Sequence, residues 1–198
     1  IAYLWPLLIV TGSALLPGER LKWNHILGTL LGLGGTALIV GRNGVSFDSA
    51  YLVGYGAAFL CAFTWAGYSL ITRRFEAVST DVVTGFCIAT SILSLICHLA
   101  LETTVWPQTG SEWLAVAGLG LLPVGAAFYA WDFGVKNGDI QILGAASYSA
   151  PLLSTLVLIV SGFAEPSLGI GIACLLVTGG AMLAAKDMIF RKTADNPA

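Results

Sequence analysis

Two prolines, Pro6 and Pro151, lie well inside long apolar segments, where a change in the backbone can create a polar site. A proline within a helix removes one backbone donor and leaves the carbonyl four residues earlier without its usual partner. Those carbonyls belong to Ala2 and Ser147. If the segments cross a bilayer, such groups need a protein partner or a wet cavity. The pattern predicts a pair of hinges beside a central site, and a tolerated helix kink is the alternative.

Aromatic side chains gather near the same positions. Tyr3 and Tyr148 each precede a proline by three residues, so each lies on the helical face of its proline. Rings of this kind stack on flat or apolar ligands and attract cations, although each one can equally serve helix packing. The residues predicted to line a substrate-binding cavity are Tyr3, Trp5, Trp65, Tyr68, Tyr129, Trp131, Ser147 and Tyr148.

Charged groups are absent from the middle of every apolar segment. Asp132 comes closest, near one end of its segment. It is interpreted either as a solvated interfacial carboxylate or as a gate residue that pairs with Lys136 at i+4. Proton-coupled pumps usually place a carboxylate at mid-membrane depth, so any such coupling group is expected to lie outside this chain.

Metal and nucleophile patterns are also missing from the sequence. The four cysteines stand in apolar runs without a CxxC or Cys/His spacing. No Ser/His/Asp set, phosphate-binding glycine loop or HExxH motif occurs. The sequence therefore predicts no metal, no cofactor and no enzymatic activity.

The composition defines the class of protein. Of the 198 residues, 57% are hydrophobic and 10% are charged, whereas a soluble domain has roughly 25% charged residues. A water-soluble domain and a disulfide scaffold are excluded, and the net charge of −2 gives no reason to expect a nucleic-acid partner. The expected fold is an all-α polytopic membrane protein in a lipid bilayer.

Seven apolar segments separated by polar breaks are predicted to be transmembrane helices. Eight of the nine Lys and Arg residues fall in alternate breaks and in the C-terminal tail, and only Arg42 lies on the other side. By the positive-inside rule this places the C-terminus in the cytoplasm. The predicted segments are 1–16, 25–41, 50–72, 82–101, 113–134, 140–163 and 167–185.

An internal repeat links the first and last of these segments. Tyr3 and Pro6 match Tyr148 and Pro151 at an offset of 145 residues, and the Gly34–Gly35 pair matches Gly179–Gly180 at the same offset. Five helices separate the equivalent segments. Because five is odd, the two copies must insert in opposite directions, as in many secondary transporters. The repeat predicts a ten-helix protein of two five-helix units, of which this chain carries helices four to ten.

These residues resemble the EamA-type branch of the drug/metabolite transporter superfamily, and within it the bacterial aromatic amino acid exporters. The resemblance rests on the Tyr3–Pro6 segment followed by Gly18–Leu21, on the glycine-rich segment 25–41, on Tyr148 to Pro151 with Glu165, and on Phe63–Tyr68 and Ala127–Asp132. It implies a ten-helix inner-membrane exporter with a central cavity. In that family Tyr3, Trp5 and Trp65 fall at cavity-lining positions.

The predicted domains are residues 1–41 as the end of the first repeat, 42–49 as the loop between repeats, 50–185 as the second repeat and 186–198 as a cytoplasmic tail. The predicted function is alternating-access export of amino acids, with aromatic ones as candidates, or of similar small metabolites. Alternatives are export of other metabolites or cationic drugs, a seven-helix receptor or sensor, and a scaffolding subunit. A monomer and a homodimer are both compatible with the sequence.

Overall fold

The computed structural model describes residues 1–41, 48–75 and 77–186 of the chain. They form two compact units, one from Ile1–Ile71 together with the chain from Asp139 onward, and the other from Thr72–Gly138. Every regular element among the described residues is helical, which confirms the predicted all-α class. Most of the predicted loop at 42–49, and all but Lys186 of the predicted tail, lie outside the described residues.

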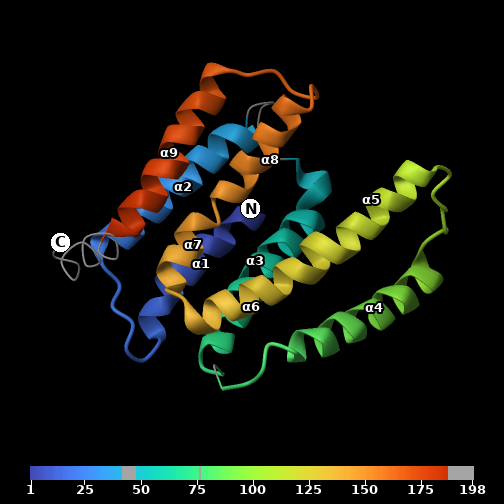
Figure 1. The fold of residues 1–198 in the computed structure, drawn as a ribbon, viewed down its shortest axis with the longest axis horizontal. Helices are drawn as coiled ribbons and strands as arrows, with labels where there is room; N and C mark the ends of the chain where they lie inside the picture. The colour runs from blue at the N-terminus through green and yellow to red at the C-terminus, as the bar shows by residue number, and fades with distance from the viewer. Residues whose placement is uncertain (42–47, 76, 187–198) are drawn as a thin grey trace, which may run out of the picture. The chain divides into compact units, whose positions relative to one another are not determined.

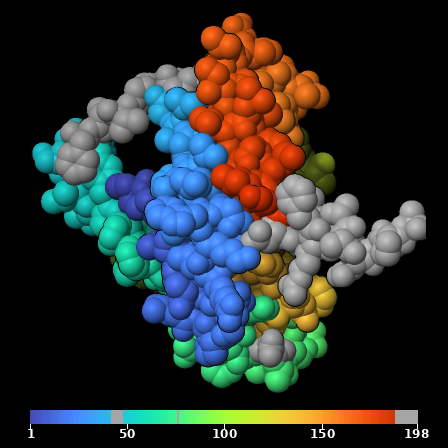
Figure 2. Space-filling view, turned by 90° about the vertical axis from the view of Figure 1, so that its left-hand side faces the viewer, coloured from blue at the N-terminus to red at the C-terminus, as the bar shows by residue number. Residues whose placement is uncertain are grey.

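The first unit contains the helices α1 (Trp5–Gly12), α2 (Trp23–Val40), α3 (Leu52–Arg73, whose last two residues belong to the second unit), α7 (Ile140–Ala146), α8 (Ser149–Val160) and α9 (Leu168–Ala184). Short 3₁₀ turns flank some of them: η1 (Ala2–Leu4), η2 (Ser13–Leu15) and η4 (Ser49–Tyr51). In Figure 1, α9 (red) runs beside α2 (light blue), and Figure 2 shows these two helices as neighbours on one face.

The second unit contains α4 (Val82–Leu101), α5 (Gly110–Leu121), the π-turn η5 (Leu122–Ala126) and α6 (Ala127–Asn137). Pro123 stands in η5, and its missing N–H interrupts the regular ladder of backbone bonds. The predicted helix over 113–134 is therefore two helices joined by a wide turn. This break at Pro123 was not predicted from the sequence.

The helices have the length and composition of membrane spans. Five of the described segments are long and apolar enough to cross a bilayer: Trp23–Val40, Ser49–Arg73, Val82–Leu101, Gly110–Asn137 and Ile140–Val160. Ala2–Leu15 and Leu168–Ala184 are shorter apolar helical segments. Large apolar side chains such as Leu101 and Val160 are more than four-fifths exposed. Such surfaces are suited to lipid, so the polytopic membrane class is confirmed.

The predicted helix over 140–163 is broken. α7 ends at Ala146 and α8 begins at Ser149, so Pro151 lies in the first turn of α8 and not inside a continuous helix. Pro6 likewise lies in the first turn of α1. Proline is well tolerated there, because the first turn of a helix has no intrahelical use for its N–H groups.

The carbonyls expected to be left free by the prolines each accept a hydrogen bond. The N–H of Trp5 donates to the Ala2 carbonyl, and the N–H of Ala150 donates to the Ser147 carbonyl at 3.1 Å. These bonds span three residues, so a 3₁₀ turn replaces the bond that each proline removes. Each carbonyl therefore has a protein partner, which is one of the two outcomes expected from the sequence.

Side-chain caps begin several helices. The Asp139 carboxylate accepts from the N–H groups of Gln141 and Ile142 at the start of α7, as its position in the sequence suggests. Thr109 caps α5 and Ser167 caps α9 in the same way. These caps define where the helices start, and so fix the register of the residues that they carry.

Candidate functional site

Helices α2 and α9 cross at close range through small residues. A Cβ atom at Gly28 would lie 2.4 Å from the carbonyl oxygen of Gly180, and one at Gly35 would lie 2.9 Å from that of Ala173. Position 28 is thus beside 180 while position 35 is beside 173, which means that the two helices run antiparallel. Small residues of this kind let helix backbones approach closely in a membrane.

The close crossing gives a testable consequence for stability. Gly28→Ala should destabilise the protein by about 1–3 kcal/mol, because the added methyl group meets backbone atoms that cannot rotate away. Thermal unfolding of the full-length protein in detergent measures the change. Gly34→Ala is the matched control, since a Cβ at Gly34 meets nothing within 4 Å. Equal melting temperatures for the two variants would contradict the close approach.

Tyr148 lies over this crossing. Its ring packs against Gly32, where a Cβ atom would lie 2.6 Å from Tyr148 Cδ2, and it shares a buried cluster with Leu152 and Val177. Its hydroxyl donates to the backbone carbonyl of Tyr3 at 3.0 Å. The side chain has no exposed surface, so the expectation that a substrate stacks on it is corrected: here Tyr148 is a packed wedge between helices.

Three of the predicted site residues form an aromatic cluster. Trp5 from α1 meets Trp65 from α3 edge to face, with ring centroids 6.2 Å apart and an interplanar angle of 89°. Tyr68, one turn further along α3, stacks on Trp65 at 5.5 Å and 30°. All three side chains are half-buried. We call Trp5, Trp65 and Tyr68 the aromatic cluster, and its partly open rings can stack on an apolar or flat ligand.

Ser147 and Tyr3 lie near the helix breaks. The Ser147 hydroxyl donates to the Leu143 carbonyl at 2.7 Å, so its proton is used within the helix and only its lone pairs remain for a ligand. The Tyr3 side chain is 37% exposed. A ligand-binding role for either residue stays a prediction.

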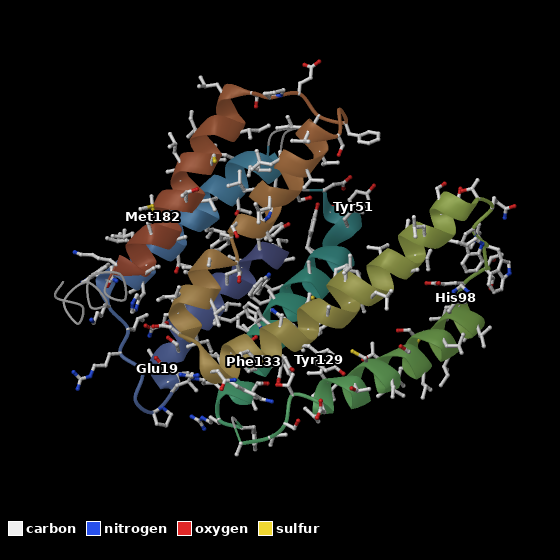
Figure 3. All side chains as sticks on the ribbon, viewed as in Figure 1. Glu19, Tyr51, His98, Tyr129, Phe133 and Met182 are labelled. Carbon is white, nitrogen blue, oxygen red and sulfur yellow. The ribbon has the colours of Figure 1, made fainter. Side chains whose placement is uncertain are left out.

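The remaining site residues belong to the second unit. Tyr129 extends from α6 (Figure 3), and its hydroxyl is hydrogen-bonded to the Thr84 hydroxyl of α4. Trp131 is half-buried. The idea that these rings share one cavity with the aromatic cluster stays a prediction.

Asp132 is part of a buried polar network and is not a solvated interfacial carboxylate. Its carboxylate lies 2.7 Å from the Lys136 ammonium, and the two side chains are 1% and 4% exposed. The Thr80 hydroxyl donates to Asp132 at 2.7 Å, and Lys136 donates to the Val78 carbonyl at 2.9 Å. The predicted i+4 pairing is confirmed, and the pair ties α6 to the loop that precedes α4.

Arg73 reinforces the same region. Its guanidinium donates to the carbonyl oxygens of Val135 and Lys136, at 3.0 and 2.6 Å. These carbonyls lie in the last turn of α6, where a cation is favourable. The end of α3 and the loop that follows it are therefore both bonded to the C-terminal part of α6.

Several buried polar residues were missed by the sequence analysis. Gln141 of α7 donates to the Ser13 hydroxyl at 3.0 Å, and both side chains are buried. His25 is buried at the start of α2, where Nδ1 accepts from the Lys22 N–H. Within the described part of the chain, the buried Thr36 hydroxyl has no hydrogen-bond partner. A polar side chain inside an apolar segment was the available signal for all four residues.

Comparison with known proteins adds to this geometry. The model of the EamA-like transporter family matches residues 52–185. The chain is 55% identical over 186 residues to the aromatic amino acid exporter YddG of Ancylobacter novellus, a match that covers 93% of this chain and 64% of that protein. It is 29% identical over 192 residues to the aromatic amino acid exporter YddG of Escherichia coli, covering 91% of this chain and 64% of that protein.

A crystal structure of a 56% identical protein superposes with a TM-score of 0.89, covering 93% of this chain and 66% of that one. The fold is therefore shared with an experimentally determined structure. The chain spans just under two thirds of the length of these relatives.

Proposed function

We infer, from the premise that this chain belongs to the EamA-like transporter family, that the full-length protein exports amino acids or similar small metabolites across a bacterial inner membrane. Aromatic amino acids are the proposed substrate class. The observation that carries this proposal is the aromatic cluster, in which Trp65 contacts both Trp5 and Tyr68. Relatives that are 55% and 29% identical to this chain over the aligned residues are named aromatic amino acid exporters.

The proposed architecture is a ten-helix inverted repeat with a cytoplasmic C-terminus. Residues 1–41 would be the last two helices of the first repeat, and 50–185 the second repeat. The antiparallel crossing of α2 and α9 supports this arrangement, because repeat-related helices in opposite orientations must run antiparallel. The family match over 52–185 is close to the proposed second repeat.

The proposed mechanism is alternating access about hinges at Pro6 and Pro151. The α-helical bond that each proline removes is already absent there, so the backbone can bend with few hydrogen bonds lost. Asp132 is proposed as part of a cytoplasmic gate, since its pair with Lys136 closes a polar contact between α6 and a loop. The protein is not proposed to catalyse a reaction.

A substrate panel tests the proposed function. The purified full-length protein is reconstituted in liposomes preloaded with unlabelled phenylalanine, and uptake of radiolabelled phenylalanine by counterflow is measured. Competition by tryptophan and tyrosine, but not by aspartate or a quaternary ammonium compound, is the expected result. Counterflow with the quaternary ammonium compound and none with phenylalanine would favour the alternative, export of cationic drugs.

A further inference from the structure

The two copies of the internal repeat share one departure from α-helical bonding, a 3₁₀ bond just before the proline, which we call the break. The bond from Trp5 to the Ala2 carbonyl and the bond from Ala150 to the Ser147 carbonyl are related by the offset of 145 residues. A buried proline follows each break, Pro6 in one copy and Pro151 in the other. The tyrosines of the two breaks, Tyr3 and Tyr148, therefore occupy equivalent positions in the backbone.

The contacts between α2 and α9 are related by the same offset of 145 residues. Gly28 is equivalent to Ala173 and Gly35 to Gly180, so the contact of Gly28 with Gly180 is the counterpart of the contact of Gly35 with Ala173. The middle of the crossing falls at Gly32 on α2 and at its equivalent, Val177, on α9. We call the surface made by Gly32 and Val177 the tyrosine seat.

Exact twofold symmetry would direct both tyrosines at this one surface, and the structure places Tyr148 there. A twofold axis perpendicular to a pair of antiparallel helices exchanges the two helices. It maps each face of the pair onto itself, so equivalent residues of the two copies lie on the same face. Tyr148 fills the seat with no exposed surface, and its hydroxyl reaches the backbone of Tyr3. The Tyr3 side chain is 37% exposed. Two copies with the same backbone break thus place equivalent side chains in different surroundings.

We propose that Tyr3 and Tyr148 are alternative occupants of the tyrosine seat, and that their exchange switches the protein between its two access states. This rests on the proposed function, because it assumes alternating access. A bistable packed contact is a recognised way to convert a small local change into a large movement.

The seat itself favours Tyr148 over Tyr3. The ring of Tyr148 packs where Gly32 has no side chain, and a single methyl group there would come within 2.6 Å of it. When Tyr3 occupies the seat, its ring packs against Val177 in the way that the ring of Tyr148 packs against Gly32. The branched side chain of Val177 fills the space that Gly32 leaves open for Tyr148. The state with Tyr148 in the seat is therefore the ground state, and exchange needs a rearrangement around Val177.

Disulfide trapping tests the exchange without any transported substrate. The full-length protein is prepared with its native cysteines replaced, and paired cysteines are introduced at Gly32 and Tyr148 or at Tyr3 and Val177. A Cβ at Gly32 would lie 3.0 Å from Tyr148 Cβ, close to the 3.5–4.5 Å typical of disulfides. Cross-links are identified in oxidised membranes by mass spectrometry of proteolytic peptides.

Both pairs are expected to form disulfides, with the 3/177 pair forming more slowly because Tyr148 must first leave the seat. Adding Tyr148→Ala to the 3/177 pair should accelerate its cross-linking several-fold. The control pair joins Tyr3 to Leu175 of α9, which is 76% exposed and outside the seat, and it should not form.

A 32/148 cross-link with no 3/177 cross-link would make Tyr148 a fixed wedge and overturn the exchange. Failure of both pairs would overturn the seat itself. Because neither readout involves flux, these outcomes are separate from those of the counterflow experiment: a protein that transports a different substrate would still show both cross-links.

Discussion

Asp132→Asn is expected to lower the free energy of unfolding by about 3–5 kcal/mol. The substitution leaves the Lys136 ammonium buried without its carboxylate partner, 2.7 Å away in the native protein. The cost arises chiefly from that uncompensated charge, because burying an ion without a partner is strongly unfavourable. Chemical or thermal unfolding of the full-length protein in detergent measures the effect.

A double variant separates the buried charge from the loss of packing. Asp132→Asn combined with Lys136→Met removes both charges while keeping similar side-chain volumes, so much of the lost stability should return. Glu165→Gln, at an exposed carboxylate, is the control and should change stability by less than about 0.5 kcal/mol. A double variant as unstable as Asp132→Asn alone would show that the ion pair is not the source of the effect.

Trp65→Ala is expected to reduce phenylalanine counterflow about tenfold, equivalent to roughly 1.4 kcal/mol of lost interaction. Trp65 makes a ring contact with each of the other two members of the aromatic cluster. Its loss removes a stacking surface and the edge-to-face contact with Trp5. Trp65→Phe should retain more flux, because a smaller ring can still take part in edge and face contacts.

Phe63→Ala is the matched control for this experiment. Phe63 lies on the same helix, is about half exposed, and packs on Phe59 at a centroid distance of 4.7 Å, away from the aromatic cluster. Flux for this variant should stay near that of the parent protein at equal expression. Equal losses in the Phe63 and Trp65 variants would remove the aromatic cluster from the proposed site.

The helical segments could be predicted from the sequence because hydropathy and charge asymmetry act locally. The α4 helix, for example, begins and ends at the predicted residues, Val82 and Leu101. The breaks were harder to predict. A proline such as Pro151 is compatible with a kink inside a helix or with a new helix start, and only the surrounding packing selects the second.

The candidate site could also be predicted from the sequence only in part. The spacing of Asp132 and Lys136 reveals an i+4 pair, but their burial depends on Thr80 and Val78, which come from a loop more than fifty residues earlier. The burial of Tyr148 depends on the absence of a side chain at Gly32 on another helix. Contacts between distant segments of this kind leave no local pattern in a single sequence.

The orientation of two equivalent loops tests the inverted repeat most directly. Arg20 and Glu165 are 145 residues apart, both are exposed, and they occupy equivalent loops of the two copies. Single cysteines at these positions, in the cysteine-free full-length protein, are treated with a membrane-impermeant thiol reagent in cells with a permeabilised outer membrane. We expect labelling at position 165 in cells with an intact inner membrane, and at position 20 only after that membrane is opened. Labelling of both positions from the same side would contradict the inverted repeat and the transport mechanism built on it.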